Sequence, residues 1–169
     1  MTQPRIFLVG PMGAGKTTIG RRIAKSLRKN FVDADQELEQ RTGASVALIF
    51  DVEGEAGFRE REKRVIEELT QLNDVVLATG GGAVLDPDNR TALSKRGFVI
   101  YLHALVEELV ERTRRDASRP LLNTDDPIGK MREIMVQRDS LYRSIADLVI
   151  DTGKVSLTEV VKEIRMACK

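Results

Sequence analysis

A glycine-rich loop near the start of the chain limits its possible folds more than any other feature. The loop Gly10-Pro-Met-Gly-Ala-Gly-Lys-Thr-Thr18 follows the apolar run Ile6–Val9 and precedes a helical pattern over 19–27. Strand, glycine loop and helix in this order, with the spacing Gly-x-x-x-x-Gly-Lys-Thr, are typical of a phosphate-binding loop. Glycines let backbone N–H groups turn toward an anion, and the helix N-terminus adds partial positive charge at the same point. The stretch predicts that the chain binds a nucleoside triphosphate.

Two side chains at the end of the loop strengthen this interpretation. Lys16 supplies a mobile cation for the β- and γ-phosphates, and the hydroxyl of Thr17 can bind Mg²⁺. A glycine turn that only joins a strand to a helix would need neither residue. We therefore expect a triphosphate and Mg²⁺ at this loop.

The composition excludes several classes of protein. At 169 residues the chain is expected to be a single domain, 1–169, and its net charge of +1 gives no overall field toward nucleic acid or membranes. No apolar run reaches the ~20 residues of a membrane span, and 1–4 is too short for a signal peptide. The one cysteine, Cys168, fits a reducing compartment. We expect a cytoplasmic monomer without nucleic-acid or membrane partners.

Strand and helix patterns alternate along the chain. Apolar runs predict strands at 5–9, 31–35, 75–78, 98–102 and 148–151. Helical patterns cover 16–29, 36–41, 46–52, 55–72, 86–95, 105–114, 128–142 and 156–166, and 114–126 reads as a mobile polar loop. The alternation predicts an α/β fold with three layers, in which helices cover both faces of a five-stranded parallel sheet.

The region from Ser45 to Leu72 predicts two successive helices. Ser45 caps the first, and Gly54 separates it from the longer second helix. Apolar residues at helical spacing predict the inward face of the second helix: Phe58, Val65, Ile66, Leu69 and Leu72.

Carboxylates and glycines follow the predicted strands at one edge of the sheet. Since parallel strands collect ligands at their carboxyl ends, we expect the loop at Gly10, Asp33 and Asp35, and the glycine turn (Gly80, Gly81 and Gly82) to form one site. Asp33 is the candidate metal carboxylate, because no aspartate ends the 75–78 run. Asp35 could accept a hydrogen bond from a hydroxyl that receives the phosphate.

Two kinds of phosphate chemistry compete for this site. Asp51-Val-Glu-Gly54 matches the γ-phosphate sensor of a GTPase switch, but 45–52 reads as helix. The guanine-reading Asn-Lys-x-Asp is also missing, because 123–126 lacks the lysine. A phosphotransferase needs cations for charge on the transferred group, and Arg59, Arg119 and Arg138 are the candidates.

Several further motifs resemble the bacterial cytosolic shikimate kinases over nearly the whole chain. They are Gly10–Gly20 around the loop, Asp33-Ala-Asp35, Gly54-Glu-Ala-Gly-Phe-Arg59, Ala78-Thr-Gly-Gly-Gly82, Arg119-Pro-Leu-Leu122 and Arg138-x-x-Leu-Tyr142. The loop alone is shared with many kinases, whereas the later motifs in this order are far more specific.

The resemblance implies a fold like the nucleoside monophosphate kinases, with a substrate-binding segment at about 33–62 and a lid at about 114–126. It implies that ATP phosphorylates the 3-hydroxyl of shikimate, giving shikimate 3-phosphate and ADP. Lys16, Asp35 and Arg119 would be catalytic, and Mg²⁺ would be held by Thr17 and, through water, by Asp33. ATP would be bound by Gly13, Ala14, Gly15, Lys16, Thr17, Thr18, Arg112 and Arg119, and shikimate by Asp35, Arg59, Gly80, Gly81, Gly82 and Arg138.

Two departures from the family and three alternatives accompany this prediction. Ser140 stands where the family has proline, which removes a φ restraint near Arg138, and 152–156 lacks the side chains expected near adenine. The acceptor could instead be another polyol acid such as gluconate, or a nucleoside monophosphate. The chain could also be a regulatory domain that binds these ligands without turnover.

Overall fold

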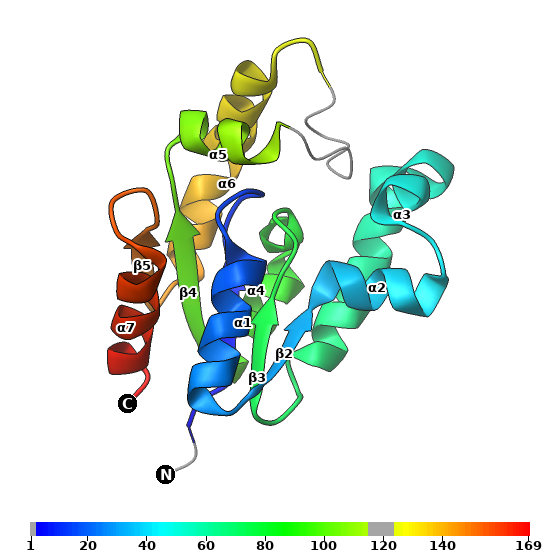
Figure 1. The fold of residues 1–169 in the computed structure, drawn as a ribbon. Helices are drawn as coiled ribbons and strands as arrows, with labels where there is room; N and C mark the ends of the chain where they lie inside the picture. Colours follow the sequence, from blue (N-terminus) through cyan, green and yellow to red (C-terminus); the bar gives the residue numbers. More distant parts are fainter. Residues whose placement is uncertain (1–2, 115–123) are drawn as a thin grey trace.

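A five-stranded parallel sheet forms the centre of the computed structural model, which describes residues 3–114 and 124–169. The strands lie in the order β2-β3-β1-β4-β5, so the central strand is the one that leads into the glycine-rich loop (Figure 1). Their bounds are β1 (Ile6–Val9), β2 (Asn30–Asp33), β3 (Val75–Ala78), β4 (Phe98–His103) and β5 (Leu148–Asp151).

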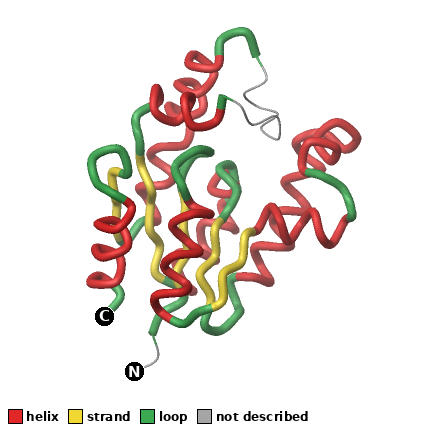
Figure 2. The backbone as a smooth tube through the Cα atoms, viewed as in Figure 1, coloured by secondary structure: helices red, strands yellow, loops and turns green. Residues whose placement is uncertain are grey.

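Helices cover both faces of this sheet (Figure 2). On one face, α1 (Lys16–Leu27) packs against β2, β3 and α7 (Leu157–Ala167). On the other face lie α4 (Pro87–Arg96) and α6 (Pro127–Ile145), and the 3₁₀ turn η1 (Ala83–Leu85) contacts both. The predicted α/β class with a five-stranded parallel sheet is confirmed.

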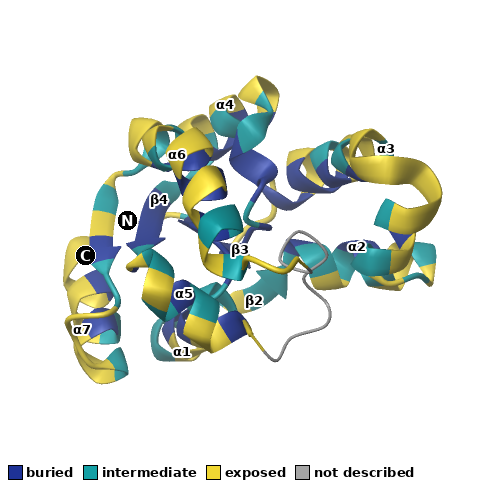
Figure 3. Cartoon of the chain, turned by 90° about the horizontal axis from the view of Figure 1, so that it is seen from above, coloured by how far each residue is buried: buried dark blue, intermediate teal, exposed yellow. Residues whose placement is uncertain are grey.

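Three further helices surround the carboxyl ends of the strands. They are α2 (Ala34–Thr42), α3 (Val46–Leu69) and α5 (Val106–Thr113). The helices α2 and α3 pack on each other and form an arm beside the sheet, whereas α5 packs on α6 (Figure 3). Among the described residues, none of the helices is long and apolar enough to cross a membrane.

The central strands are buried on both faces, which explains their continuous apolar sequences. All four residues of β1 and the segment Val99–Leu102 of β4 are fully buried. The register pairs Phe7 of β1 with Leu77 of β3 and Val99 of β4. This packing fixes the position of the loop that leaves β1.

The second strand is shorter than predicted, and its two aspartates lie in different elements. The strand ends at Asp33, whose Oδ1 accepts hydrogen bonds from the backbone N–H groups of Asp35 and Gln36. This cap starts α2 directly, so Asp35 lies in the first turn of a helix. The prediction that 31–35 forms one strand tip was therefore wrong for Asp35.

The prediction of two helices separated at Gly54 is confirmed. Gly54 has a φ of 73° and a ψ of 177°, which breaks the helical path inside α3. Arg61 donates two hydrogen bonds to the carboxylate of Glu53 across this break, at 2.8 and 2.7 Å. The break divides α3 into a short arm segment and a long segment that reaches the core.

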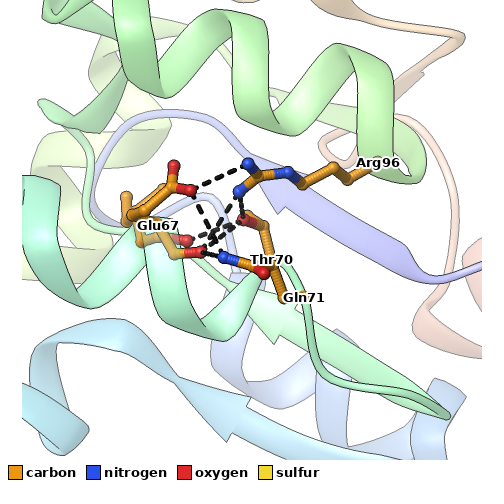
Figure 4. A network of polar contacts seen from close by, with 5 residues as sticks. Glu67, Thr70, Gln71 and Arg96 are labelled. Atoms are coloured by element: carbon orange, nitrogen blue, oxygen red, sulfur yellow. Dashed lines mark hydrogen bonds and ion pairs between the residues drawn. The ribbon is translucent and has the colours of Figure 1, made fainter.

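The long segment ends earlier than predicted, in a network of polar contacts (Figure 4). Arg96 of α4 donates to the backbone oxygen of Glu67, to its carboxylate and to the Thr70 hydroxyl. The helix stops at Leu69, so Leu72 lies beyond it and is 43% exposed. Assigning Leu72 to the inward face was therefore wrong. Arg96 ties the end of α3 to α4 behind the sheet.

Two other helix ends also differ from the prediction. The first helix stops at Leu27, because Arg28 adopts a left-handed conformation with a φ of 55° and caps it. The α6 helix continues beyond Tyr142 to Ile145. Neither difference moves a residue of the predicted site.

Candidate active site

A cavity of about 720 Å³ lies at the carboxyl ends of β1, β2 and β3. The loop after β1, the start of α2, both segments of α3 and the turn after β3 contribute to its walls. Most predicted site residues line this cavity: Gly13, Gly15, Lys16, Thr17, Thr18, Asp33, Asp35, Arg59, Gly80, Gly81, Gly82, Arg112 and Arg138. These segments meet at one cavity, as expected for loops at the carboxyl ends of parallel strands.

The glycine-rich loop wraps around the N-terminus of α1. Gly15 caps this helix in a left-handed conformation with a φ of 94°. Lys16 Nζ lies over the loop and donates to the backbone oxygens of Gly10 and Pro11, at 2.6 and 2.8 Å. The ammonium group and the first turn of α1 therefore concentrate positive charge where an anion can bind.

Thr17 and Asp33 meet at the side of this loop. The Thr17 hydroxyl donates to Asp33 Oδ2 at 2.8 Å, while the other oxygen of Asp33 caps α2. Both are hard oxygen ligands, and a pair of them suits Mg²⁺, which usually keeps several waters and binds phosphate oxygens. In residues 3–114 and 124–169, no cluster of three or more His, Cys, Asp or Glu residues could hold a metal. The Thr17 and Asp33 oxygens fit a Mg²⁺ ion whose other ligands are water and phosphate oxygens.

The glycine turn after β3 lies between two carboxylates. A Cβ atom at Gly80 would lie 2.8 Å from Asp35 Oδ1 and 2.9 Å from Glu62 Oε2. Because only glycine leaves that space open, both carboxylates can approach the backbone of the turn. A small hydroxylated ligand on this turn would therefore find hydrogen-bond acceptors beside it.

Arg59 approaches the same turn from the long segment of α3. Its guanidinium lies directly against Gly82 and donates to Glu62 Oε1 at 2.9 Å and to Glu55 Oε1 at 3.2 Å. It also lies over the ring of Phe58, 5.1 Å from the centroid. These contacts hold the cation at the edge of the cavity. Glu55 and Arg59 lie one helical turn apart, a spacing that allows this ion pair.

Arg138 reaches the turn from the opposite side, on α6. Its side chain lines the cavity although the residue is only 2% exposed, and its Nη1 would lie 3.7 Å from a Cβ at Gly81. Its Nε has no hydrogen-bond partner among the described residues. Since a buried cation is costly unless it is paired, Arg138 favours an anionic ligand in the cavity.

Glu62 is the residue of the site that the sequence prediction missed. It is 2% exposed, and burial raises the pKa of its carboxyl to about 7, with Arg59 acting in the opposite direction and Asp35 raising it further. The signal in the sequence is its spacing: position 62 falls on the same helical face as Phe58, Val65 and Leu69. A charged residue on that face must have a partner, and Arg59 is that partner.

Arg112 lies at the far side of the loop from the two carboxylates. Its Nη1 donates to the backbone oxygen of Gly13 at 3.0 Å and to the Thr152 hydroxyl at 3.3 Å. It therefore connects the glycine-rich loop to the turn between β5 and α7. Phe50 and Phe58 line the opposite part of the cavity, with ring centroids 4.7 Å apart.

Two predicted residues are not placed in the cavity. Ala14 is 1% exposed and is absent from the lining, because its side chain points into the core below the loop. Arg119, and with it most of the predicted lid, falls outside the described residues. The Asp51-Val-Glu-Gly54 motif lies in α3, away from any strand end, so the GTPase-switch alternative lacks its required geometry.

Solved structures of shikimate kinases share this fold over nearly the whole chain. The enzyme from Acinetobacter baumannii in complex with shikimate has a TM-score of 0.96 and 47% identity, covering 98% of this chain and 93% of that one. The enzyme from Aquifex aeolicus has a TM-score of 0.81 and 35% identity, covering 96% and 95%. A gluconokinase from Sinorhizobium meliloti reaches a TM-score of 0.64 at 18% identity, which shows the fold alone.

Sequence comparisons agree with the structural ones. The family model described as shikimate kinase matches residues 12–169. The shikimate kinase of Bordetella pertussis is 58% identical over 159 residues, which are 94% of this chain and 75% of that protein. The shikimate kinase of Nitrosococcus oceani is 54% identical and covers 94% and 84%. The chain therefore belongs to the shikimate kinase family.

Proposed function

We propose that this protein transfers the γ-phosphoryl group of ATP to the 3-hydroxyl of shikimate. The observation that carries the proposal is the pair of arginines, Arg59 and Arg138, that flanks a glycine turn facing the phosphate-binding loop. Family membership supports ATP as the donor, and the cavity supplies a place for a small acid as the acceptor. We further propose that the protein acts as a monomer in the cytoplasm, where ATP is available.

The loop after β1 would hold the donor. Backbone N–H groups of Gly13, Ala14 and Gly15, with Lys16 and Thr18, would surround the β- and γ-phosphates. Lys16 would exchange its bonds to the Gly10 and Pro11 carbonyls for phosphate oxygens. Mg²⁺, held by Thr17 and through water by Asp33, would neutralise charge on the phosphates. Arg112, beside Gly13 and Thr152, would lie along the adenine.

The glycine turn would hold the acceptor. Arg59 and Arg138 would bind the shikimate carboxylate, because planar guanidinium groups fit carboxylates in a bidentate manner. The backbone of Gly80, Gly81 and Gly82 would lie against the ring.

Asp35 would take the proton of the 3-hydroxyl of shikimate. At the same time the oxygen of that hydroxyl would bond to the γ-phosphorus, and the bond between the γ-phosphorus and the ADP oxygen would break. The Asp35 carboxylate lies beside Gly80 and lines the same cavity as the loop. We also propose that Arg119 meets the γ-phosphate and stabilises the charge on the transferred group.

The substrate is tested by following ADP release from ATP and Mg²⁺ with shikimate, gluconate and nucleoside monophosphates in parallel. We expect turnover with shikimate alone. Turnover with gluconate or a monophosphate instead would overturn the acceptor assignment, and binding of shikimate without turnover with any acceptor would favour a regulatory domain. Lys16→Met should abolish turnover and preserve the circular dichroism spectrum. This variant, purified in the same way, is the matched control for contaminating kinases.

A further inference from the structure

Arg138 shares one face of α6 with a buried tyrosine that does not itself line the cavity. Tyr142 follows Arg138 by one helical turn and is fully buried. Tyr142 is absent from the cavity walls, whereas Arg138 and Gly81 belong to them. Any effect of Tyr142 on a ligand must therefore pass through its neighbours.

The phenol of Tyr142 contacts both of these neighbours. Its hydroxyl donates a hydrogen bond to the backbone oxygen of Gly81. The Arg138 guanidinium lies near enough to the phenol for its charge to lower the pKa of Tyr142. A phenol oxygen donates one hydrogen bond and can accept others, so a single atom can connect a carbonyl group to a guanidinium. Arg138 Nη1 also lies near Gly81, at 3.7 Å from the position of a Cβ atom there. The phenol and the Arg138 guanidinium therefore both lie beside Gly81.

The environment keeps the hydroxyl available as a donor. Burial raises the pKa of Tyr142 to about 12, with the charge of Arg138 acting in the opposite direction. The phenol is protonated at neutral pH, as an ordinary tyrosine is, and it can donate its part-buried hydrogen bond to the Gly81 carbonyl. Loss of that bond would leave the part-buried Gly81 carbonyl without its donor, which favours a shift of the turn.

We propose that Tyr142 is a positioning residue for the acceptor acid, because its hydroxyl fixes the spacing between the glycine turn and the Arg138 guanidinium. The inference rests on the proposed function, in which these two groups bind the acid. Tyr142 sets their separation from behind the cavity, without touching the acid or ATP. It also supplies a restraint on Arg138 in a chain that has Ser140 at the place of the family's proline.

The second tyrosine of the chain provides a matched control. Tyr101 of β4 stacks on Tyr142 with ring centroids 4.9 Å apart and is also fully buried. Its hydroxyl, however, donates to Asp139 Oδ1 at 2.7 Å and contacts neither the glycine turn nor Arg138. Tyr101→Phe and Tyr142→Phe thus remove the same group from neighbouring rings, but only one removal reaches the acceptor side.

Steady-state kinetics with shikimate and ATP distinguish the two tyrosines. We expect Tyr142→Phe to lower kcat/KM for shikimate about tenfold, the factor that corresponds to about 1.4 kcal/mol, mainly through KM. The KM for ATP should stay within about twofold of wild type, and Tyr101→Phe should change neither KM. Equal KM values for shikimate in wild type and Tyr142→Phe would overturn the proposal, as would an equal rise in both variants.

A second measurement reads the wild-type protein and uses a variant for assignment alone. The chain has two tyrosines, so 3-fluorotyrosine labelling gives two fluorine resonances, which Tyr101→Phe assigns. Shikimate should shift the Tyr142 resonance and leave the Tyr101 resonance in place. No shift at saturating shikimate would contradict the proposal. Failure of the wild type to phosphorylate shikimate would instead reject the proposed function, so the two failures are distinguishable.

Discussion

Glu62 places a titrating carboxyl against the cation that is proposed to bind the acid. The groups that face it are Arg59 on its own helix, Asp35 on α2, and Arg138 and Tyr142 on α6. Ionised Glu62 competes with the acid for Arg59, whereas neutral Glu62 leaves the guanidinium to the ligand. Since burial raises the pKa of Glu62 to about 7, this competition changes within the physiological pH range.

We predict that the KM for shikimate rises on the order of tenfold between pH 6 and pH 8, as Glu62 loses its proton. Glu62→Gln cannot ionise, so its KM for shikimate should be nearly constant over this range. The measurement is KM for shikimate and for ATP at half-unit steps of pH. A Glu62→Gln profile with the wild-type slope would assign the effect to another group.

Glu62 also gives a prediction for the pH dependence of stability. The folded-state pKa of Glu62, about 7, lies above the ordinary glutamate value of 4.5. Between these two pH values the native state therefore holds a proton that the unfolded chain has lost. The free energy of unfolding should therefore fall as pH rises from about 4.5 to 7, by about 3 kcal/mol for this group. Urea denaturation of wild type and Glu62→Gln at pH 5 and pH 8 measures it, and equal pH dependence would contradict it.

Arg59 and Arg138 offer a test of the proposed carboxylate-binding site. Arg59→Ala and Arg138→Ala should each weaken shikimate binding by about 2–3 kcal/mol, because each leaves a carboxylate without a paired cation. Arg61→Ala is the control, since Arg61 pairs with Glu53 on the exposed side of the same helix. Calorimetric titration with shikimate measures all three. If both alanine variants at 59 and 138 bind as wild type does, the carboxylate lies elsewhere.

At the scale of elements, the break in α3 decides how the arm meets the cavity. Gly54 occupies a backbone region that is nearly restricted to glycine, and a Cβ there would have nothing within 4 Å. Gly54→Ala should therefore cost about 1–3 kcal/mol of unfolding free energy through backbone strain alone. Gly43→Ala, at an equally open left-handed helix end, is the control and should cost less. Urea denaturation checks both, and an unchanged midpoint for Gly54→Ala would show that the break can relax.

The sequence specifies the elements well and their ends less well. Apolar runs such as 75–78 predict buried strands because the signal, a short continuous apolar segment, is local to the sequence. The end of β2 was missed because it depends on a side-chain cap, in which Asp33 turns the chain into α2. The end of α3 was missed because Arg96, which lies 26 positions after Thr70 and 29 after Glu67, binds both residues. Contacts between distant segments carry no local pattern.

At the scale of the whole molecule, site residues could be predicted where a local motif marks them, and not where contacts between distant segments do. Lys16, Thr17 and the glycine turn belong to short motifs with a fixed mechanism, so the sequence identifies them. Glu62 lies in a run of charged residues, and only its helical face separates it from solvated neighbours. Tyr142 was noticed as part of a motif, but its link to Gly81 spans 61 positions and needed the structure.

The order of the strands has a consequence for how such a chain can change in evolution. Strands β2 and β3 lie on one side of β1, and β4 and β5 on the other. The acceptor side is therefore encoded almost entirely by one continuous stretch, 33–82, which recombination could replace in a single event. Arg138 is the exception, because it lies on α6, which is outside this stretch of the sequence. A chain that acquired a foreign stretch at 33–82 would keep Arg138. Its new acceptor site would therefore still favour a substrate with a negative charge.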